Sequence, residues 1–350
     1  MYGLYQIVVF TIIDILNTLK SPFFIGIVFI IYLQYYKIGQ MEKEIRGYRR
    51  NTFLKLFRSI IFGILGGIIT TVLFLYLGVV VIPKDFMYIL GAAIGLSFIN
   101  PRYMCFAYGG GIISLLSLTI SFPKIQISQV MSVVAVLHMV ESVLIFLDGA
   151  KDKLPFFFQG EKEIHGGFNM NRFWPIPFVV FMGDGLIQPI TLMAILSYGD
   201  YSISSYPRRK TMNTSIILFI YSIILLYISK MMINPFIPPI FAILGHEYII
   251  LRNKKKENRG FHIFSPPNKG VKILETLPNS IGQELGIGMG DIVLKINEID
   301  VNNVKDLEDI MILEPTSMRI ELFNIKSGLI TKKYNGKGKP LGLVIVPRGF

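Results

Sequence analysis

The sequence predicts an all-α membrane bundle followed by a small α+β domain. Three observations favour this fold class. The 350-residue chain is 52% hydrophobic and only 17% charged, which is typical of polytopic membrane proteins and not of soluble globules. Long apolar runs alternate with short basic segments up to residue 251. Beyond residue 269 the pattern changes to short stretches of alternating apolar and polar residues, which is typical of half-buried strands.

Charge and cysteine content narrow the class further. The formal charge is +12, but most basic residues flank apolar runs, as they do in the cytoplasmic loops of membrane proteins. We therefore interpret the charge as membrane topology and expect no nucleic-acid binding. The single cysteine, Cys105, has no partner for an internal disulfide. The first residues lack the basic segment and cleavage site of a signal peptide, so no cleavable leader is expected.

Seven apolar runs have or approach the length that crosses about 30 Å of hydrocarbon. They are residues 22–36, 59–83, 103–122, 127–147, 174–197, 213–229 and 233–251. The first segment, residues 4–19, carries Asp14 and Asn17, so we expect it to lie at the interface or to pack on the bundle.

Two basic segments set the expected orientation. Residues 37–58 and 252–259 are both rich in Lys and Arg, which predicts that both are cytoplasmic. An even number of crossings must then join them, and the six later apolar runs supply it. The short piece 86–98, rich in Gly and Ala, is therefore predicted to be a re-entrant or half helix.

Four ionisable residues lie in or beside the apolar runs. His138 and Glu141 are one helical turn apart, Asp148 follows them, and Asp184 is flanked by glycines. Ionisable groups in a membrane are candidates for an ion path or a metal site. The alternative, which we favour, is a polar cluster that fixes helix packing. For Asp184 the choices are the cap of a broken helix or a catalytic carboxylate.

The pair His246–Glu247 resembles half of a zinc-protease motif. An HExxH protease needs its second histidine where Ile250 stands, and isoleucine cannot bind zinc. Site-two intramembrane proteases also carry an "LDG" segment after the "HE", whereas here residues 147–149 precede it. We therefore predict no catalytic residue, no metal and no cofactor. His246 and Glu247 are interpreted as helix-end residues at the cytoplasmic interface.

The predicted domains are a transmembrane domain at 1–251, a basic linker with Pro and Gly at 252–268, and a cytoplasmic domain at 269–350. Strands are expected in "VKILET", "DIVLKINEID", "MRIELFN", "LITKKY" and "LGLVIV", with helices at 279–286 and 303–312. Such a set of elements predicts a small, partly open β-barrel with two helices.

The C-terminal stretch resembles the bacterial PDZ family. The positions that match its "GD" turn, its "IN" hairpin and the apolar residue that follows are Gly290, Asp291, Ile296, Asn297 and Val301. Gly288 and Met289 depart from the family, which often has a basic residue and a proline there. The resemblance implies a partly open barrel with a peptide-binding groove, in which a bound peptide adds a strand to the sheet.

The permuted bacterial form of the PDZ fold implies where that groove lies. The carboxylate-binding loop and its strand come last in the chain, and the second helix forms the facing wall. The implied peptide-binding residues are Leu341, Gly342, Leu343, Val344, Leu307, Ile310 and Met311. An ordinary closing strand whose apolar residues fill the core is the alternative for "LGLVIV".

Three long stretches of the first domain resemble the membrane core of the MinJ family, the cell-division topological determinants of Gram-positive rods. They are "NPRYMCFAYGGGIISLLSL", "LHMVESVLIFLDGA" and "IHGGFNMNRFWPIPFVV". The resemblance implies a non-catalytic membrane adaptor at septa and poles, which connects a DivIVA-like polar scaffold to MinC-like and MinD-like division inhibitors. A site-two-like protease and a PDZ-regulated transporter are the rival classes. Glycine-rich faces such as "GILGGIITT" and "GGGIISLLS" are predicted to contact transmembrane partners.

Overall fold

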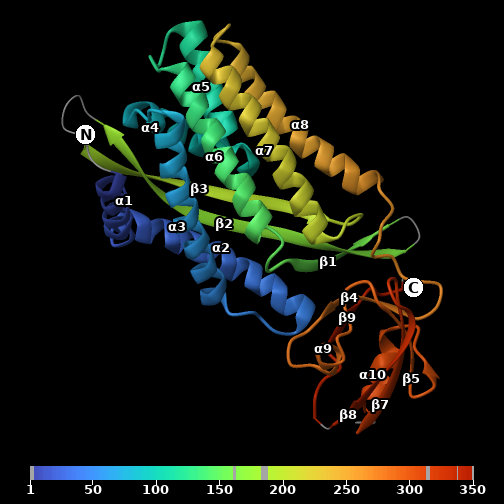
Figure 1. Cartoon of the computed structure of the whole chain (residues 1–350). Helices are drawn as coiled ribbons and strands as arrows, with labels where there is room; N and C mark the ends of the chain where they lie inside the picture. Colours follow the sequence, from blue (N-terminus) through green and yellow to red (C-terminus); the bar gives the residue numbers. More distant parts are fainter. Residues whose placement is uncertain (1–3, 161–162, 183–187, 313–315, 337, 349–350) are drawn as a thin grey trace.

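The computed structural model describes residues 4–160, 163–182, 188–312, 316–336 and 338–348. Figure 1 shows a long β-hairpin crossing the first domain, with helices on both sides and a small domain at one end. The helices are α1 (Leu4–Leu19), α2 (Pro22–Arg46), α3 (Thr52–Leu77), α4 (Pro83–Ser97), α5 (Phe106–Ile120), α6 (Ile127–Asp148), α7 (Pro207–Met231) and α8 (Ile237–Arg259). The strands are β1 (Leu154–Gln159), β2 (Ile164–Met182) and β3 (Gln188–Ser202).

Four helices of the described chain, α2, α3, α6 and α7, are long and apolar enough to cross a membrane. Each of them contains or overlaps a predicted span. The helix α5 has only 15 residues, and the second half of α8 is charged. By length and composition, the helices of the described residues therefore do not confirm the predicted total of about seven spans. The piece 86–98 does form a short helix, α4.

The prediction of a membrane helix at 174–197 is wrong, and so is the all-α class. The described residues of this range, 174–182 and 188–197, belong to β2 and β3, which pair antiparallel. Pro175, Pro177 and Pro189 each lack the N–H group that a helix needs, and a proline in a helix interior costs about 3 kcal/mol. The β-branched and aromatic residues between them favour a strand.

The helices α2 and α3 cover one edge of β2. At this edge the Phe173 N–H donates to Tyr35 Oη at 3.3 Å, and the Val179 N–H donates to Thr71 Oγ1 at 2.9 Å. The two residues between them that face the same edge are prolines, which have no N–H group to leave unpaired. The strand therefore ends its ladder here without a buried, unsatisfied donor.

The glycines of α3 allow it to lie directly on this strand. A Cβ at Gly63 would stand 2.0 Å from the Pro175 carbonyl oxygen, and one at Gly67 would stand 1.8 Å from that of Pro177. A Cβ added at Gly111 on α5 would likewise stand 2.5 Å from Ile243 Cγ1 of α8. These glycine-rich faces are used inside the chain, so the prediction that they contact transmembrane partners is wrong for these residues.

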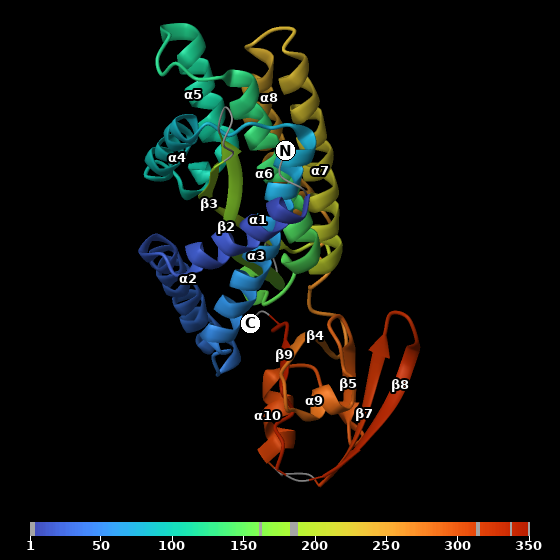
Figure 2. The same cartoon turned by 60° about the vertical axis from the view of Figure 1, so that its left-hand side comes forward.

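The centre of the first domain is α6. Every residue from 130 to 140 is buried, and the helix carries apolar residues on all its faces. Such a helix belongs inside a bundle and not at its surface. It packs between α3, α5, α7 and α8 (Figure 2), and its side chains join those of Trp174, Ile176 and Phe178 from β2 in one core.

The C-terminal domain has the predicted PDZ-like order of elements. They are β4 (Val271–Thr276), α9 (Ile281–Glu284), β5 (Ile292–Ile296), β6 (Ile299–Asp300), α10 (Val304–Ile312), β7 (Ser317–Asn324), β8 (Gly328–Asn335) and β9 (Leu343–Ile345). The sheet order is β8-β7-β5-β4-β9, with β6 paired to β5. Buried Val271, Ile273, Val293, Ile296 and Ile320 belong to its core.

The connection between the two domains is shorter than predicted, because α8 continues to Arg259. The C-terminal domain packs against the helical domain through a separate apolar cluster. Phe168 of β2 meets Phe264 edge-on, with ring centroids 5.3 Å apart, and Leu274 and Val346 complete the cluster. The two domains are thus in contact near the junction (Figure 1).

Candidate functional site

The strand β9 forms one edge of the sheet of the C-terminal domain. It pairs with β4 through Leu343 opposite Thr276 and Ile345 opposite Ile273. On its other side no described strand is paired with it. A peptide that adds a strand by β-augmentation would have to pair with this side of β9.

The loop before β9 is held in one shape by its own carbonyls. The carbonyls of Pro340, Leu341 and Gly342 accept hydrogen bonds at 2.8 to 3.1 Å from backbone N–H groups between residues 277 and 282. Gly342 has a φ of +64°, and an added Cβ would stand 2.2 Å from the Cβ of Ser280. Only glycine fits this position.

The side chains named for the groove fall into three groups. Leu341, Leu307 and Ile310 are buried in the domain core, so they contribute mainly to packing. Met311 and Leu343 are half-buried and pack on the rim of that core. Val344 lies on the opposite face of β9, against the cluster around Phe264 at the domain junction. Of the three residues predicted on α10, Met311 is thus the one whose side chain is not taken up by the core.

The predicted intramembrane cluster is divided in the structure. Asp148 accepts hydrogen bonds from Arg172 Nε at 2.6 Å and from Trp174 Nε1 at 3.0 Å, and Asp152 also binds Arg172 at 3.0 Å. Arg172 and Asp148 are fully buried. This buried pair fixes α6 to β2, which is the packing alternative. Asp184 lies outside the described residues.

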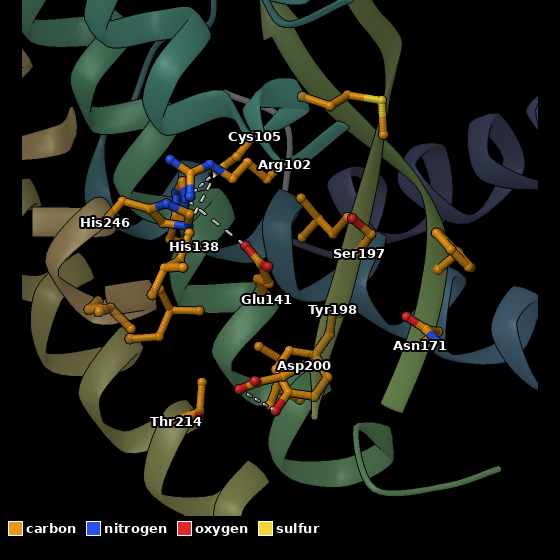
Figure 3. A pocket seen from close by; sticks show the side chains of 18 of the residues that line it. Arg102, Cys105, His138, Glu141, Asn171, Ser197, Tyr198, Asp200, Thr214 and His246 are labelled. Carbon is orange, nitrogen blue, oxygen red and sulfur yellow. Dashed lines mark hydrogen bonds and ion pairs between the residues drawn. The ribbon is translucent and has the colours of Figure 1, made fainter. Parts of the chain in front are cut away.

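His138 and Glu141 belong to a different site, together with Cys105 and His246 (Figure 3). Cys105 Sγ lies 3.1 Å from His138 Nε2 and 3.5 Å from His246 Nε2. Glu141 Oε2 lies 4.0 Å from His138 Nε2. The four side chains come from the N-terminal end of α5, from α6 and from α8. Local spacing therefore groups only His138 with Glu141 and could not have added Cys105 or His246.

A cavity of about 620 Å³ opens beside these side chains. Its polar lining includes Arg102, Cys105, His138, Glu141, Tyr198 and Asp200. Figure 3 shows Glu141 pointing into it below the two imidazoles. The cavity thus extends from the Cys–His–His cluster to the C-terminal end of β3, where Tyr198 and Asp200 lie.

His246 and Glu247 are not at a helix end, as the sequence had indicated, because α8 continues to Arg259. The Glu247 carboxylate accepts hydrogen bonds from Tyr108 Oη at 2.5 Å and from Arg102 Nη2 at 3.0 Å. Both of its oxygens are occupied, and Ile250 offers no ligand. Glu247 is therefore an ion-pair partner of Arg102 and not a general base of an HExxH site.

The fold and these sites define a class: a protein with several membrane-type helices that carries a PDZ domain. The PDZ domain family model matches residues 248–323. It begins inside α8 and ends before β8 and β9.

Among curated proteins, the chain is similar to the cell division topological determinant MinJ of Bacillus subtilis (strain 168). The two are 24% identical over 108 residues, which are 30% of this chain and 27% of that protein. The alignment therefore spans only about a quarter of the relative's length. No solved structure matches the chain.

Proposed function

We propose that this chain is a non-catalytic membrane adaptor of bacterial division-site selection, with its PDZ groove held at the cytoplasmic face. The position of β9 at the edge of the described sheet is the observation that carries the proposal, since a bound peptide would extend the sheet there. The similarity to MinJ supports the division context.

The proposed orientation rests on the basic segments. The ends of α2 and α8 carry Lys43, Arg46, Lys256 and Arg259, and Arg46 contacts the PDZ domain directly. Positive residues favour the cytoplasmic side, so the groove would face the cytoplasm. Attachment to the membrane would confine the search for partners to that surface and raise their effective concentration. The partners we propose are a DivIVA-like polar scaffold and a MinD-like inhibitor.

Two neighbouring residues of α10 provide a matched test of the groove. Met311 is half-buried at the proposed wall, whereas Ile312 is 75% exposed. Full-length protein in detergent would be used to capture purified DivIVA-like and MinD-like proteins. We expect Met311→Glu to weaken capture at least tenfold and Ile312→Glu to leave it unchanged. Equal capture by both variants would exclude this groove.

The glycine of the loop is a poor test position. A side chain at Gly342 would collide with Ser280, so its replacement would disturb the fold as well as the groove. Deletion of residues 260–350 tests the wider adaptor role in cells. We expect misplaced septa with the helical domain still in the membrane, and normal division in such cells would contradict the proposal.

A further inference from the structure

We propose that Cys105, His138 and His246 bind a zinc ion, with Glu141 as the fourth ligand. One possible ligand atom from each of the first three residues lies within 4.8 Å of the others. Thiolate sulfur, imidazole nitrogen and carboxylate oxygen are the donors that zinc takes in tetrahedral protein sites. This inference is independent of the adaptor function.

The observed separations fit a tetrahedral ion. Zinc lies about 2.3 Å from sulfur and about 2.0 Å from imidazole nitrogen, which places those two ligand atoms about 3.5 Å apart at the tetrahedral angle. The two separations from Cys105 Sγ are 3.1 Å to His138 Nε2 and 3.5 Å to His246 Nε2. Glu141 Oε2 is 4.0 Å from His138 Nε2 but is not among the ligand atoms that lie within 4.8 Å of one another, so its side chain must turn toward the ion to complete the set.

The first histidine is already oriented as a ligand. Its Nδ1 lies 2.7 Å from the Val134 carbonyl oxygen, an acceptor that requires the hydrogen to be on Nδ1. The lone pair of His138 is therefore on Nε2, which faces Cys105. Metal-binding histidines commonly donate their other N–H to a carbonyl or carboxylate in this way.

The other imidazole also turns its Nε2 toward the thiol. His246 Nδ1 is buried without a hydrogen-bond partner among the described residues, whereas its Nε2 lies 3.5 Å from Cys105 Sγ. The rings of His138 and His246 have centroids only 5.3 Å apart, and Glu141 Oε2 lies 4.0 Å from His138 Nε2. An ion bound between these groups accounts for the close approach of the two imidazoles to one thiol.

Charge balance favours the same ion. A thiolate, a carboxylate and two neutral imidazoles sum to −2, and a divalent cation makes the site neutral, which lowers the cost of burying it. The nearby Arg102 is already paired with Glu247 at 3.0 Å. A closed site with four protein ligands is the structural kind of zinc site, and here it would join α5, α6 and α8. The last of these helices leads directly to the PDZ domain.

Cobalt is a suitable probe because its thiolate complexes absorb light. Full-length protein with a histidine-free affinity tag would be stripped with a chelator in detergent and titrated with Co²⁺. We expect one equivalent to bind, with a sulfur-to-cobalt charge-transfer band that Zn²⁺ removes by displacement. Cys105→Ser should abolish the band, and His138→Gln or His246→Gln should weaken binding on the order of ten- to a hundredfold. Absence of the band from the wild type would overturn the site.

The chain provides matched controls, since its other two histidines, His165 and His262, lie at the domain junction. His165→Gln and His262→Gln should bind cobalt like the wild type. Binding that depends on this pair and survives Cys105→Ser would also overturn the proposal.

A measurement on the wild-type chain needs no variant, so its result does not depend on whether a variant folds. Cys105 is the only cysteine, so alkylation measured by mass spectrometry reports on it alone. Bound Zn²⁺ should slow this alkylation at least tenfold, and an unchanged rate would contradict the proposal.

Discussion

The Arg46 guanidinium binds the Glu275 carboxylate through two hydrogen bonds, Nε to Oε2 at 2.6 Å and Nη2 to Oε1 at 2.9 Å. Arg46 is in the last turn of α2, and Glu275 is in β4 of the PDZ domain. Arg50 adds a third bond to the same carboxylate, at 2.9 Å. A two-pronged pair of this kind fixes direction as well as distance. It ties the orientation of the PDZ domain to a membrane-type helix.

Glu275→Gln should loosen this contact. The amide keeps the shape but removes the charge opposite Arg46, whose side chain is fully buried. Because Glu42 still pairs with Arg46, we expect a loss of about 1.5–3 kcal/mol, as for one hydrogen bond to a charged group. Thermal unfolding and protease cleavage within residues 260–270 would measure it.

The control for this change is Glu298→Gln. Glu298 pairs with Arg319 at 3.1 Å, but both side chains are more than half exposed. Exposed pairs contribute about 0–1 kcal/mol, so cleavage of the linker should stay at the wild-type rate. Equal effects of the two variants would mean that the Arg46–Glu275 pair does not hold the domain.

Gly67→Ala should destabilise the helical domain. Its Cβ would stand 1.8 Å from the Pro177 carbonyl oxygen, so α3 and β2 must separate. Overpacking of this kind costs about 1–3 kcal/mol or more. Gly91→Ala is the matched control, because nothing lies within 4 Å of its Cβ and alanine favours a helix by up to about 1 kcal/mol. Melting temperatures in detergent should move in opposite directions, and a stable Gly67→Ala protein would argue against this packing.

Asp148→Asn should be severely destabilising and should leave cobalt binding at Cys105 intact in whatever fraction folds. Arg172 has no exposed surface, and removal of one partner of a buried pair costs about 3–5 kcal/mol. Folded yield and thermal stability measure the first effect. Normal stability of this variant would mean that Asp148 does not hold α6 to β2. It would favour the other interpretation of Asp148, as part of an ion path or metal site.

Sequence periodicity predicted the PDZ domain well, because its strands alternate apolar and polar residues and its turns carry glycines at fixed places. The strand "VKILET" and the helix at 303–312 both lie where they were expected. In the first domain, hydrophobicity alone could not separate a membrane helix from a buried strand at 174–197. Its prolines were the signal, since three of them in one helix are incompatible with the hydrogen-bond ladder.

The polar sites were harder to predict, because their members are distant in sequence. His138 was selected with Glu141 from a one-turn spacing, and the structure places them 4.0 Å apart. Cys105 was considered only for a disulfide, and His246 only with Glu247 as half of a zinc-protease motif. In the structure Cys105 Sγ lies 3.1 Å from His138 Nε2 and 3.5 Å from His246 Nε2. Only the packing of three helices brings these residues together.

The contact between His165 and His262 should make the domain junction sensitive to acid. The two rings lie 4.7 Å apart, and His165 Nδ1 is 2.9 Å from Ser265 Oγ. Burial lowers the pKa of His165, the neighbouring His262 lowers it further, and only Glu163 acts in the opposite direction. We call the domains docked when they are in contact as in the structure, and separated when this contact is broken. Below the usual histidine pKa of about 6.5, His165 therefore binds more protons in the separated state than in the docked state. Docking is then favoured at neutral pH and weakens as the pH falls.

Protease cleavage within residues 260–270 should accordingly accelerate between neutral pH and about pH 5, the range in which histidine changes charge. His165→Gln removes the titrating ring, so we expect a flatter pH profile with little change at neutral pH. Ser265→Ala serves as the control, because it removes the hydrogen bond from His165 Nδ1 but leaves both imidazoles in place. An acid response that persists in full in His165→Gln would assign the sensitivity to another group, since the docked and separated states would then differ in proton binding elsewhere.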